Sequence, residues 1–205
     1  MNSKWVKTLL LGWFVTVSVP LVYFHLWHNT SLPQEKPINM IELESYSSEG
    51  LAVDSKKWQK IHFITDKCLC SNDLAEYLVE RGASKELNVM EKVIVVGKKS
   101  DFESRLNKKG FITQRISEED LAAKYGITGV PLLVVISPEK KIEYYGGYDS
   151  RKINPGTDFK DTEILEQAMA GKSLGSLPKF GCAVSKELQA TLDPFKLKYG
   201  DWHNE

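Results

Sequence analysis

Apolar and polar positions divide the chain into an uninterrupted apolar segment at the N-terminus and a longer part that alternates between two periodicities. Short apolar runs predict strands at 58–65, 89–97, 111–116, 132–136 and 141–145. Apolar positions at helical spacing predict helices at 72–81, 118–125 and 161–170, and another that opens at Ser100 and ends near Gly110. Strands that alternate with helices in this order indicate the α/β class.

The N-terminal segment has the features of a membrane anchor. From Thr8 to Leu26 it contains no Asp, Glu, Lys or Arg, and this length is sufficient for a helix to cross a bilayer. Lys4 and Lys7 precede it, so the positive-inside rule places the N-terminus in the cytoplasm. The rival is a cleaved signal peptide, but the segment runs on into Trp27 without the small residues of a cleavage site. We therefore expect an uncleaved single-pass transmembrane helix.

Four regions follow from this pattern. Residues 1–28 form the cytoplasmic N-terminus and transmembrane anchor, and residues 29–40, with Pro33 and Pro37, form an extended tether. Residues 41–171 form the α/β domain, and residues 172–205 form a C-terminal extension that carries Cys182. Everything after the tether is expected outside the cytoplasm, in a periplasmic or other extracytoplasmic compartment where disulfides can form.

Composition and charge exclude some classes of function. The chain of 205 residues has 42% hydrophobic and 26% charged residues, which is ordinary for a globular protein. Lys plus Arg and Asp plus Glu are equal at 27 each, so no basic excess indicates a nucleic-acid partner. The function must therefore be sought in a local site.

Two thiols lie where a predicted strand gives way to a predicted helix. Cys68 and Cys70 follow the strand at 58–65 and precede the helix at 72–81. Unpaired backbone N–H groups and the positive end of the helix dipole favour a thiolate at such a helix N-terminus. Lys67 adds a positive charge, whereas Asp66 would oppose it or accept a proton. The thiolate is the form of cysteine that attacks disulfides, so this turn is the candidate catalytic site.

The same turn resembles the redox-site region of the thioredoxin superfamily, because Phe63 lies five residues before Cys68. Residues 125–131, Tyr-Gly-Ile-Thr-Gly-Val-Pro, and the apolar run at 132–136 resemble the family's cis-proline segment and the strand after it. The resemblance covers residues 58–148 and implies a thioredoxin-like fold. It also implies that Pro131 packs beside the attacking sulfur and that the backbone of Val130 pairs with substrate. The helix and strand at 100–116 resemble the insertion of the redoxin branch.

The thiol pattern departs from the family. The family's usual motif is Cys-x-x-Cys, whereas Ser71 stands here at the fourth position and the second thiol is Cys70. Three cysteines leave one thiol over after any internal disulfide, and each pairing among Cys68, Cys70 and Cys182 remains open. Cys182 precedes a predicted helix at 184–192, so it is expected either as a second thiol at a helix N-terminus or as a buried apolar residue.

Thiol–disulfide exchange is the function expected first. Cys68 would attack a partner's disulfide, and Cys70 or Cys182 would resolve the mixed disulfide. Val130 and Pro131 would bind the partner's backbone, as the resemblance implies. This function needs no cofactor, and the partners would be protein thiols and disulfides.

Three alternatives stay open. Cys68 and Cys70 could bind Cu(I), a soft ion that selects thiolates. The copper-delivery proteins that share the fold use Cys-x-x-x-Cys and a distant histidine, and neither His62 nor His203 is a convincing counterpart. Peroxiredoxins place a proline three residues ahead of the threonine that Thr65 would match, and position 62 is histidine instead. The last alternative is a non-catalytic docking domain.

Overall fold

The structure is a computed structural model that describes residues 3–28, 30–34, 56–196 and 198–200. It divides into two compact units, Met1–Thr30 and Ser31–Glu205. The boundaries that we expect between the tether, the domain and the C-terminal extension remain predictions.

The first unit is the helix α1 (Ser3–His28). Its apolar side chains are exposed on all sides, including Trp5, Leu9, Trp13 and Leu21. A helix that is apolar all round is typical of a membrane span. Among the described residues, one segment, Lys4–Tyr23, is long and apolar enough to cross a bilayer by length and composition.

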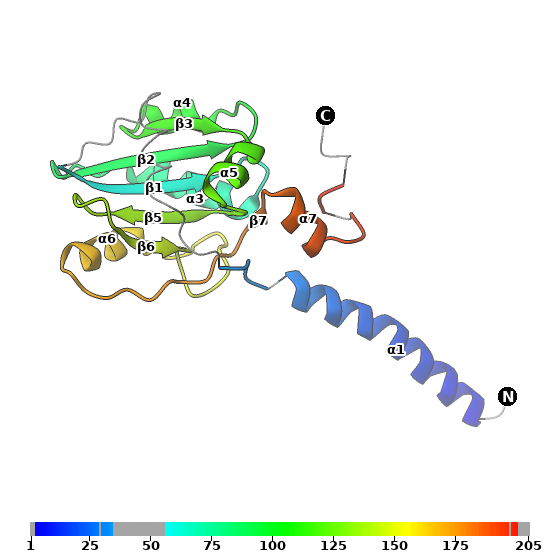
Figure 1. Ribbon diagram of the computed structural model, residues 1–205. Coiled ribbons are helices and arrows are strands. Elements are labelled where there is room, and N and C mark those ends of the chain that lie inside the picture. Colours follow the sequence, from blue (N-terminus) through cyan, green and yellow to red (C-terminus); the bar gives the residue numbers. More distant parts are fainter. Residues whose placement is uncertain (1–2, 29, 35–55, 197, 201–205) are drawn as a thin grey trace. The chain divides into compact units, whose positions relative to one another are not determined.

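The second unit is built on a five-stranded sheet with the order β3-β2-β1-β5-β6 (Figure 1). β1 is parallel to β2, and β2 is parallel to β3, whereas β5 pairs antiparallel with both β1 and β6. The strands are β1 (Trp58–Ile64), β2 (Val89–Val96), β3 (Ile112–Ile116), β5 (Leu132–Ile136) and β6 (Ile142–Gly146). The sheet confirms the α/β class and the thioredoxin-like fold.

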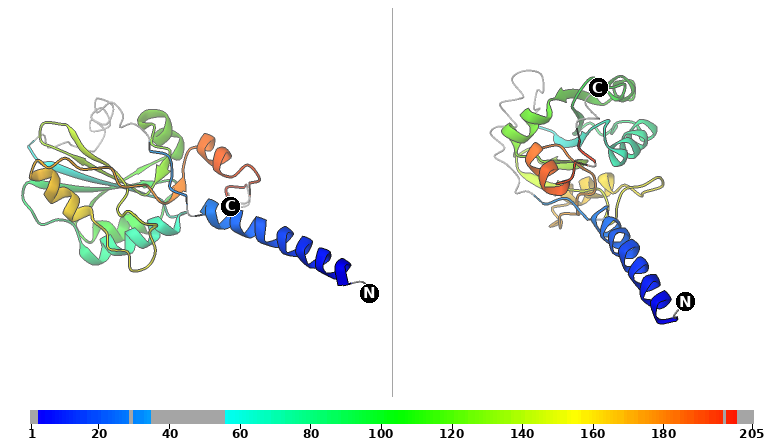
Figure 2. Two further views of the ribbon diagram at one scale, coloured as in Figure 1. Left: turned by 90° about the horizontal axis from the view of Figure 1, so that it is seen from below. Right: turned by 90° about the vertical axis from the view of Figure 1, so that its right-hand side faces the viewer.

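Helices cover both faces of the sheet, as the left view of Figure 2 shows. One face packs against α3 (Leu69–Arg81), α4 (Phe102–Asn107) and α6 (Asp161–Met169), and the other against α5 (Glu118–Tyr125). Successive side chains of a strand point to opposite faces, so Phe63 of β1 joins the α5 side and Ile64 joins the α3 side. The helix α4 and the edge strand β3 lie where the sequence predicted a helix and a strand at 100–116.

A smaller sheet lies beside the main one. β4 (Gly129–Val130) pairs antiparallel with β7 (Cys182–Ala183), and α7 (Lys186–Leu192) follows β7. The chain reaches β7 through residues 174–181, which run past the end of β6, where the Gly147 amide donates to the Leu177 carbonyl at 2.9 Å. Leu32, near the start of this second unit, is also buried here and pairs with Lys179.

Several element boundaries differ from the sequence prediction. α3 begins at Leu69 instead of residue 72, because Cys68 itself takes the extended N-cap conformation. The helix expected to open at Ser100 begins at Phe102 instead, with Asp101 as an N-cap whose side chain makes no capping hydrogen bond, and the Ser100 hydroxyl is buried without a partner. The helix predicted at 118–125 is confirmed as α5, and the hydroxyl of Ser117 caps it by accepting from the Asp120 amide at 3.0 Å. The region 35–55 lies outside the described residues.

We expect Gly147→Ala to detach residues 174–181 from the sheet. A methyl group at this position would lie 1.9 Å from the Pro178 carbonyl oxygen, so the backbone of one segment must move. Overpacking of this kind costs about 1–3 kcal/mol, which urea unfolding of the full chain in detergent would measure. Gly175→Ala is the control, because a methyl group there meets no atom within 4 Å. Equal stability of the two variants would contradict the role of this contact.

Candidate functional site

Cys68 lies between the end of β1 and the start of α3. It is the N-cap residue of α3 with φ −126° and ψ 120°, and its carbonyl accepts the first helical hydrogen bond, from Asn72, at 2.9 Å. The side chain does not cap the helix and is 1% exposed. The sulfur is therefore enclosed by protein at the end of the helix where backbone N–H groups are unpaired.

Both other thiols converge on Cys68. Hydrogen bonds from Cys182 and Cys70, together with one from the Ser71 amide, lower the pKa of Cys68 well below its ordinary value, although burial opposes them. The thiols of Cys70 and Cys182 donate these hydrogen bonds to Cys68, and donating a proton favours the neutral form. The hydrogen bonds, and after them burial, therefore raise the pKa of both thiols. Cys68 is thus the cysteine of the three whose ionised form is favoured, and none of the three forms a disulfide in the structure.

Cys182 is not at a helix N-terminus, contrary to the sequence prediction. It lies in β7, and α7 starts four residues later with Ser185 as its N-cap. In the antiparallel register, Cys182 is opposite Val130. The hydroxyl of Ser185 accepts from the Leu188 amide at 3.2 Å, so this local cap determines where the helix starts.

The peptide bond between Val130 and Pro131 is cis, as the resemblance implied. Val130 is fully buried, and its partner in the small sheet is the strand that carries Cys182. The structure therefore brings the predicted residues Cys68, Cys70, Cys182, Val130 and Pro131 into one region.

The two charged residues before Cys68 are less closely engaged. The Lys67 ammonium pairs with Glu118 of α5 at 3.0 Å. The hydrogen bonds that lower the pKa of Cys68 come from the other two thiols and from Ser71, not from these charged side chains. The roles of Asp66 and Lys67 in tuning the thiol stay predictions.

A thiol pair at Cys68 is also a ligand set for a soft metal such as Cu(I), as the sequence hypothesis held. Cys68 is hydrogen-bonded to Cys70 and to Cys182, but among the described residues the three sulfurs do not form a group whose ligand atoms all lie within 4.8 Å of one another. His62 is directed elsewhere, since both of its ring nitrogens have other partners. Copper binding therefore remains an open prediction that rests on the cysteines alone.

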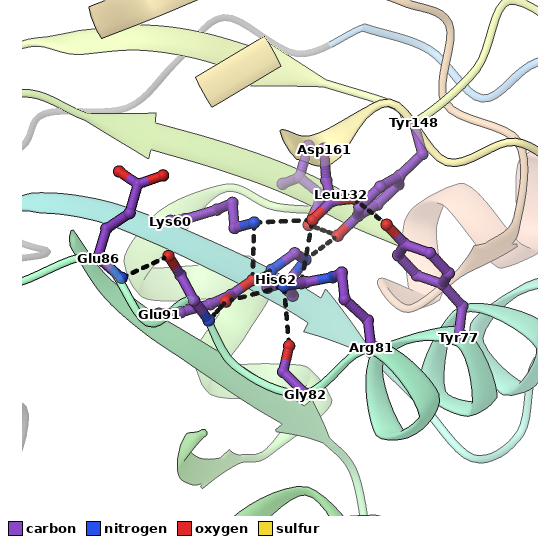
Figure 3. Close-up of polar contacts among 11 residues, drawn as sticks. Lys60, His62, Tyr77, Arg81, Gly82, Glu86, Glu91, Leu132, Tyr148 and Asp161 are labelled. Atoms are coloured by element: carbon purple, nitrogen blue, oxygen red, sulfur yellow. Dashed lines mark hydrogen bonds and ion pairs between the residues drawn. The ribbon is translucent and has the colours of Figure 1, made fainter. Parts of the chain in front are cut away.

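A second polar cluster, which the sequence analysis missed, is buried on the α3 and α6 side of the sheet (Figure 3). The Lys60 ammonium of β1 lies 2.9 Å from Glu91 of β2 and 2.8 Å from Asp161 of α6. The guanidinium of Arg81, in α3, contacts the same two carboxylates at 2.5 and 3.1 Å. Two cations thus balance two anions, and burial is compensated by direct pairing.

His62 extends this cluster towards the cis-proline segment. Its Nε2 lies 2.8 Å from Glu91, and its Nδ1 lies 2.8 Å from the Tyr148 hydroxyl. Burial lowers the pKa of His62, and Glu91 is ionised, so we assign a neutral ring that donates from Nε2 and accepts at Nδ1. The Tyr148 hydroxyl is also 3.3 Å from the carbonyl of Leu132, the residue after Pro131.

The buried cluster does not suit a metal ion, although His62, Glu91 and Asp161 offer ligand atoms within 4.8 Å of one another. The Lys60 ammonium already lies between the two carboxylates, and Arg81 contacts both. A divalent ion would have to displace these cations or lie beside them, where repulsion opposes binding. We therefore interpret this cluster as structural.

We expect Lys60→Met to destabilise the protein by about 3–5 kcal/mol, because it leaves two carboxylates buried with only the half-buried Arg81 to balance them. Chemical unfolding of the full chain in detergent measures this loss. The control is Lys186→Met, which removes an exposed ion pair with Glu119 and should leave the unfolding midpoint unchanged. A midpoint for Lys60→Met equal to that of the control would show that the buried pairing contributes no net stability.

Comparisons with known proteins support the fold and add little about function. No protein-family model matches the chain, and no curated protein matches it in sequence. An uncharacterised conserved protein from Geobacillus kaustophilus is similar in structure, with a TM-score of 0.54, 19% identity, and 77% of this chain and 90% of that chain covered. A hypothetical protein from Sinorhizobium meliloti gives a TM-score of 0.51 at 18% identity, with 65% and 82% covered.

A third similar structure is a secreted Mycobacterium tuberculosis disulfide oxidoreductase homologous to E. coli DsbE. It has a TM-score of 0.43 and 18% identity, and the match covers 59% of this chain and 86% of that chain. A similarity this weak carries no argument about function, and the two stronger matches show the fold alone.

Proposed function

We propose that this protein is a membrane-anchored, extracytoplasmic thiol–disulfide oxidoreductase with Cys68 as its nucleophile. The observation that carries the proposal is the convergence of two thiol donors and a helix N-terminus on the buried sulfur of Cys68. These contacts stabilise the thiolate, which is the reactive form in disulfide exchange. The apolar helix α1 supplies the anchor.

The reaction begins when the Cys68 thiolate attacks a disulfide of a partner protein. A bond forms between Cys68 and one partner sulfur, and the partner's own S–S bond breaks, so the second partner sulfur leaves as a thiolate and takes up a proton. A second thiol of this chain, Cys70 or Cys182, then attacks the Cys68 sulfur and releases the partner in its reduced form. The reverse sequence oxidises a partner dithiol. Val130 and Pro131 form the surface against which the partner's backbone lies.

Copper delivery is the second candidate, because Cu(I) is a soft ion that selects thiolates and Cys68 lies in hydrogen-bond contact with Cys70. The two functions differ in what protects the thiols. Exchange predicts that oxidised glutathione alone converts the Cys68 thiol to a disulfide. Copper binding predicts that the thiol is protected from alkylation only when Cu(I) is added under reducing conditions.

We expect Cys68 to remain a thiolate far below neutral pH. The thiolate absorbs in the ultraviolet, so the absorbance of the full chain in detergent, with Cys68→Ser subtracted, measures its ionisation. Because the pKa is lowered, the signal should persist as pH falls from 8 to about 5, where a thiol of ordinary pKa would be almost fully protonated.

The matched variant for this measurement is Cys182→Ala, which removes the first of the hydrogen bonds that lower this pKa. The titration should move to higher pH in this variant. An ordinary thiol titration near pH 8.5 in the unmodified chain would remove the basis of the proposed function.

A further inference from the structure

The strand β7 covers the edge of β4 that leads into Pro131. Cys182 is opposite Val130, and Ala183 is opposite Gly129. The pairing continues beyond the strand, where the Val184 amide donates to the Thr128 carbonyl at 2.7 Å. A segment from the C-terminal part of the chain therefore forms backbone hydrogen bonds on the surface that we assign to the backbone of a partner.

The contact is close enough to require a glycine. A methyl group on Gly181 would lie 2.0 Å from the Val130 carbonyl oxygen and 2.5 Å from Cδ of Pro131. The residue before Cys182 thus packs directly on the cis-proline segment. This places Cys182 beside Cys68, to which its thiol hydrogen-bonds.

Cys70 is differently placed. It belongs to the first turn of α3 and is 8% exposed, and its sulfur also lies 3.7 Å from the Ile153 carbonyl oxygen, which competes with Cys68 for the single S–H proton of Cys70. A bond from Cys70 to Cys68 would close a ring within one helical turn. Cys182 is more accessible and is carried by a separate short strand, so a bond from Cys182 to Cys68 closes no small ring within α3.

We propose that β7 occupies the position on β4 that an extended segment of the partner polypeptide takes when it binds, and that Cys182 rather than Cys70 forms the disulfide with Cys68. The proposal rests on the proposed function and deepens it. The partner recognised at this surface is a polypeptide that presents a disulfide in an extended segment. Such a segment must replace β7 on β4 before its disulfide can reach Cys68.

The partner's disulfide is the oxidant in this reaction, and Cys68 and Cys182 are oxidised by it. After Cys68 has formed a mixed disulfide with the partner, Cys182 loses its proton and attacks the Cys68 sulfur. The Cys68–Cys182 bond forms, the bond to the partner breaks, and the partner sulfur leaves as a thiolate that takes up a proton. Two electrons have then passed from Cys68 and Cys182 to the partner.

Residues after α7 hold β7 from its outer side. The Tyr199 hydroxyl accepts from the Ala183 amide at 2.9 Å, and Lys198 hydrogen-bonds to the Cys182 thiol. The buried carboxylate of Asp193 accepts from the amides of Lys198 and Tyr199 at 2.6 and 2.7 Å. A groove of about 660 Å³ lies beside Thr128 and Val184, where the pairing ends, and is also lined by Lys67 and neighbouring residues.

The first test uses oxidised glutathione, whose disulfide is too small to require pairing with β4. The reduced full chain in detergent is exposed to it, quenched with a thiol-alkylating reagent and mapped by mass spectrometry. Cys70→Ser should form the Cys68–Cys182 bond as the unmodified chain does, whereas Cys182→Ser should retain glutathione on Cys68. The two variants carry the same substitution and differ only in the thiol removed.

The outcomes separate the two proposals. If Cys68 takes up no glutathione and forms no bond in the unmodified chain, the proposed function fails and the assignment of Cys182 fails with it. If Cys68 reacts but Cys182→Ser releases glutathione as fast as the unmodified chain through a Cys68–Cys70 bond, exchange stands and the assignment to Cys182 is wrong.

A second test concerns β7 as a cover. Gly181→Ala should push β7 away from Val130, so Cys68 should be alkylated about tenfold faster or more than in the unmodified chain. Gly175→Ala, in the same approach segment but with no atom near the added methyl group, should alkylate at the unmodified rate. An unchanged rate in a folded Gly181→Ala variant would show that β7 does not control access to Cys68.

Discussion

The buried pairing of Glu91 and Asp161 with Lys60 and Arg81 is the constraint on which the arrangement of the thiol site depends. It joins β1 and β2 to the C-terminal end of α3 and to α6. β1 leads into Cys68 and α3 leads out of it, so their relative direction determines where the sulfur lies. Charges buried in this way are tolerated only when each has its partners, and this requirement permits few relative positions of the strand and the helix.

The same cluster reaches the other side of the site through His62 and Tyr148. The Tyr148 hydroxyl contacts both the His62 ring and the backbone of Leu132. Pro131 directly precedes Leu132, and Val130 holds β7. The buried cluster therefore fixes both β1, which ends near Cys68, and the segment that holds Cys182. It does so through the backbone, and none of the hydrogen bonds described above joins its side chains to the sulfurs.

Much of the fold followed from periodicity, because long amphipathic or apolar elements carry a strong local signal. The strand before Cys68 and the helix after it were predicted on this basis, whereas the segment that leads into Pro131 was predicted from its resemblance to the thioredoxin superfamily. β4 and β7 were not, since strands of two residues have no period to detect, and their pairing joins positions far apart in the sequence. The buried cluster was missed for a related reason. Lys60 and His62 in β1 appear as the solvent-facing half of an alternating strand, and the partners that bury them come from β2, α3 and α6.

Pairing of β7 with β4 also solves a general problem of exposed strands. An uncovered strand edge offers unpaired N–H and C=O groups to any other chain. Here the other flank of Gly129 is filled by Leu32, since a methyl group on Gly129 would lie 2.5 Å from the Leu32 side chain, and Leu32 also pairs with Lys179 in the segment that leads to β7. The residues just after α1 therefore pack against the strand that β7 covers.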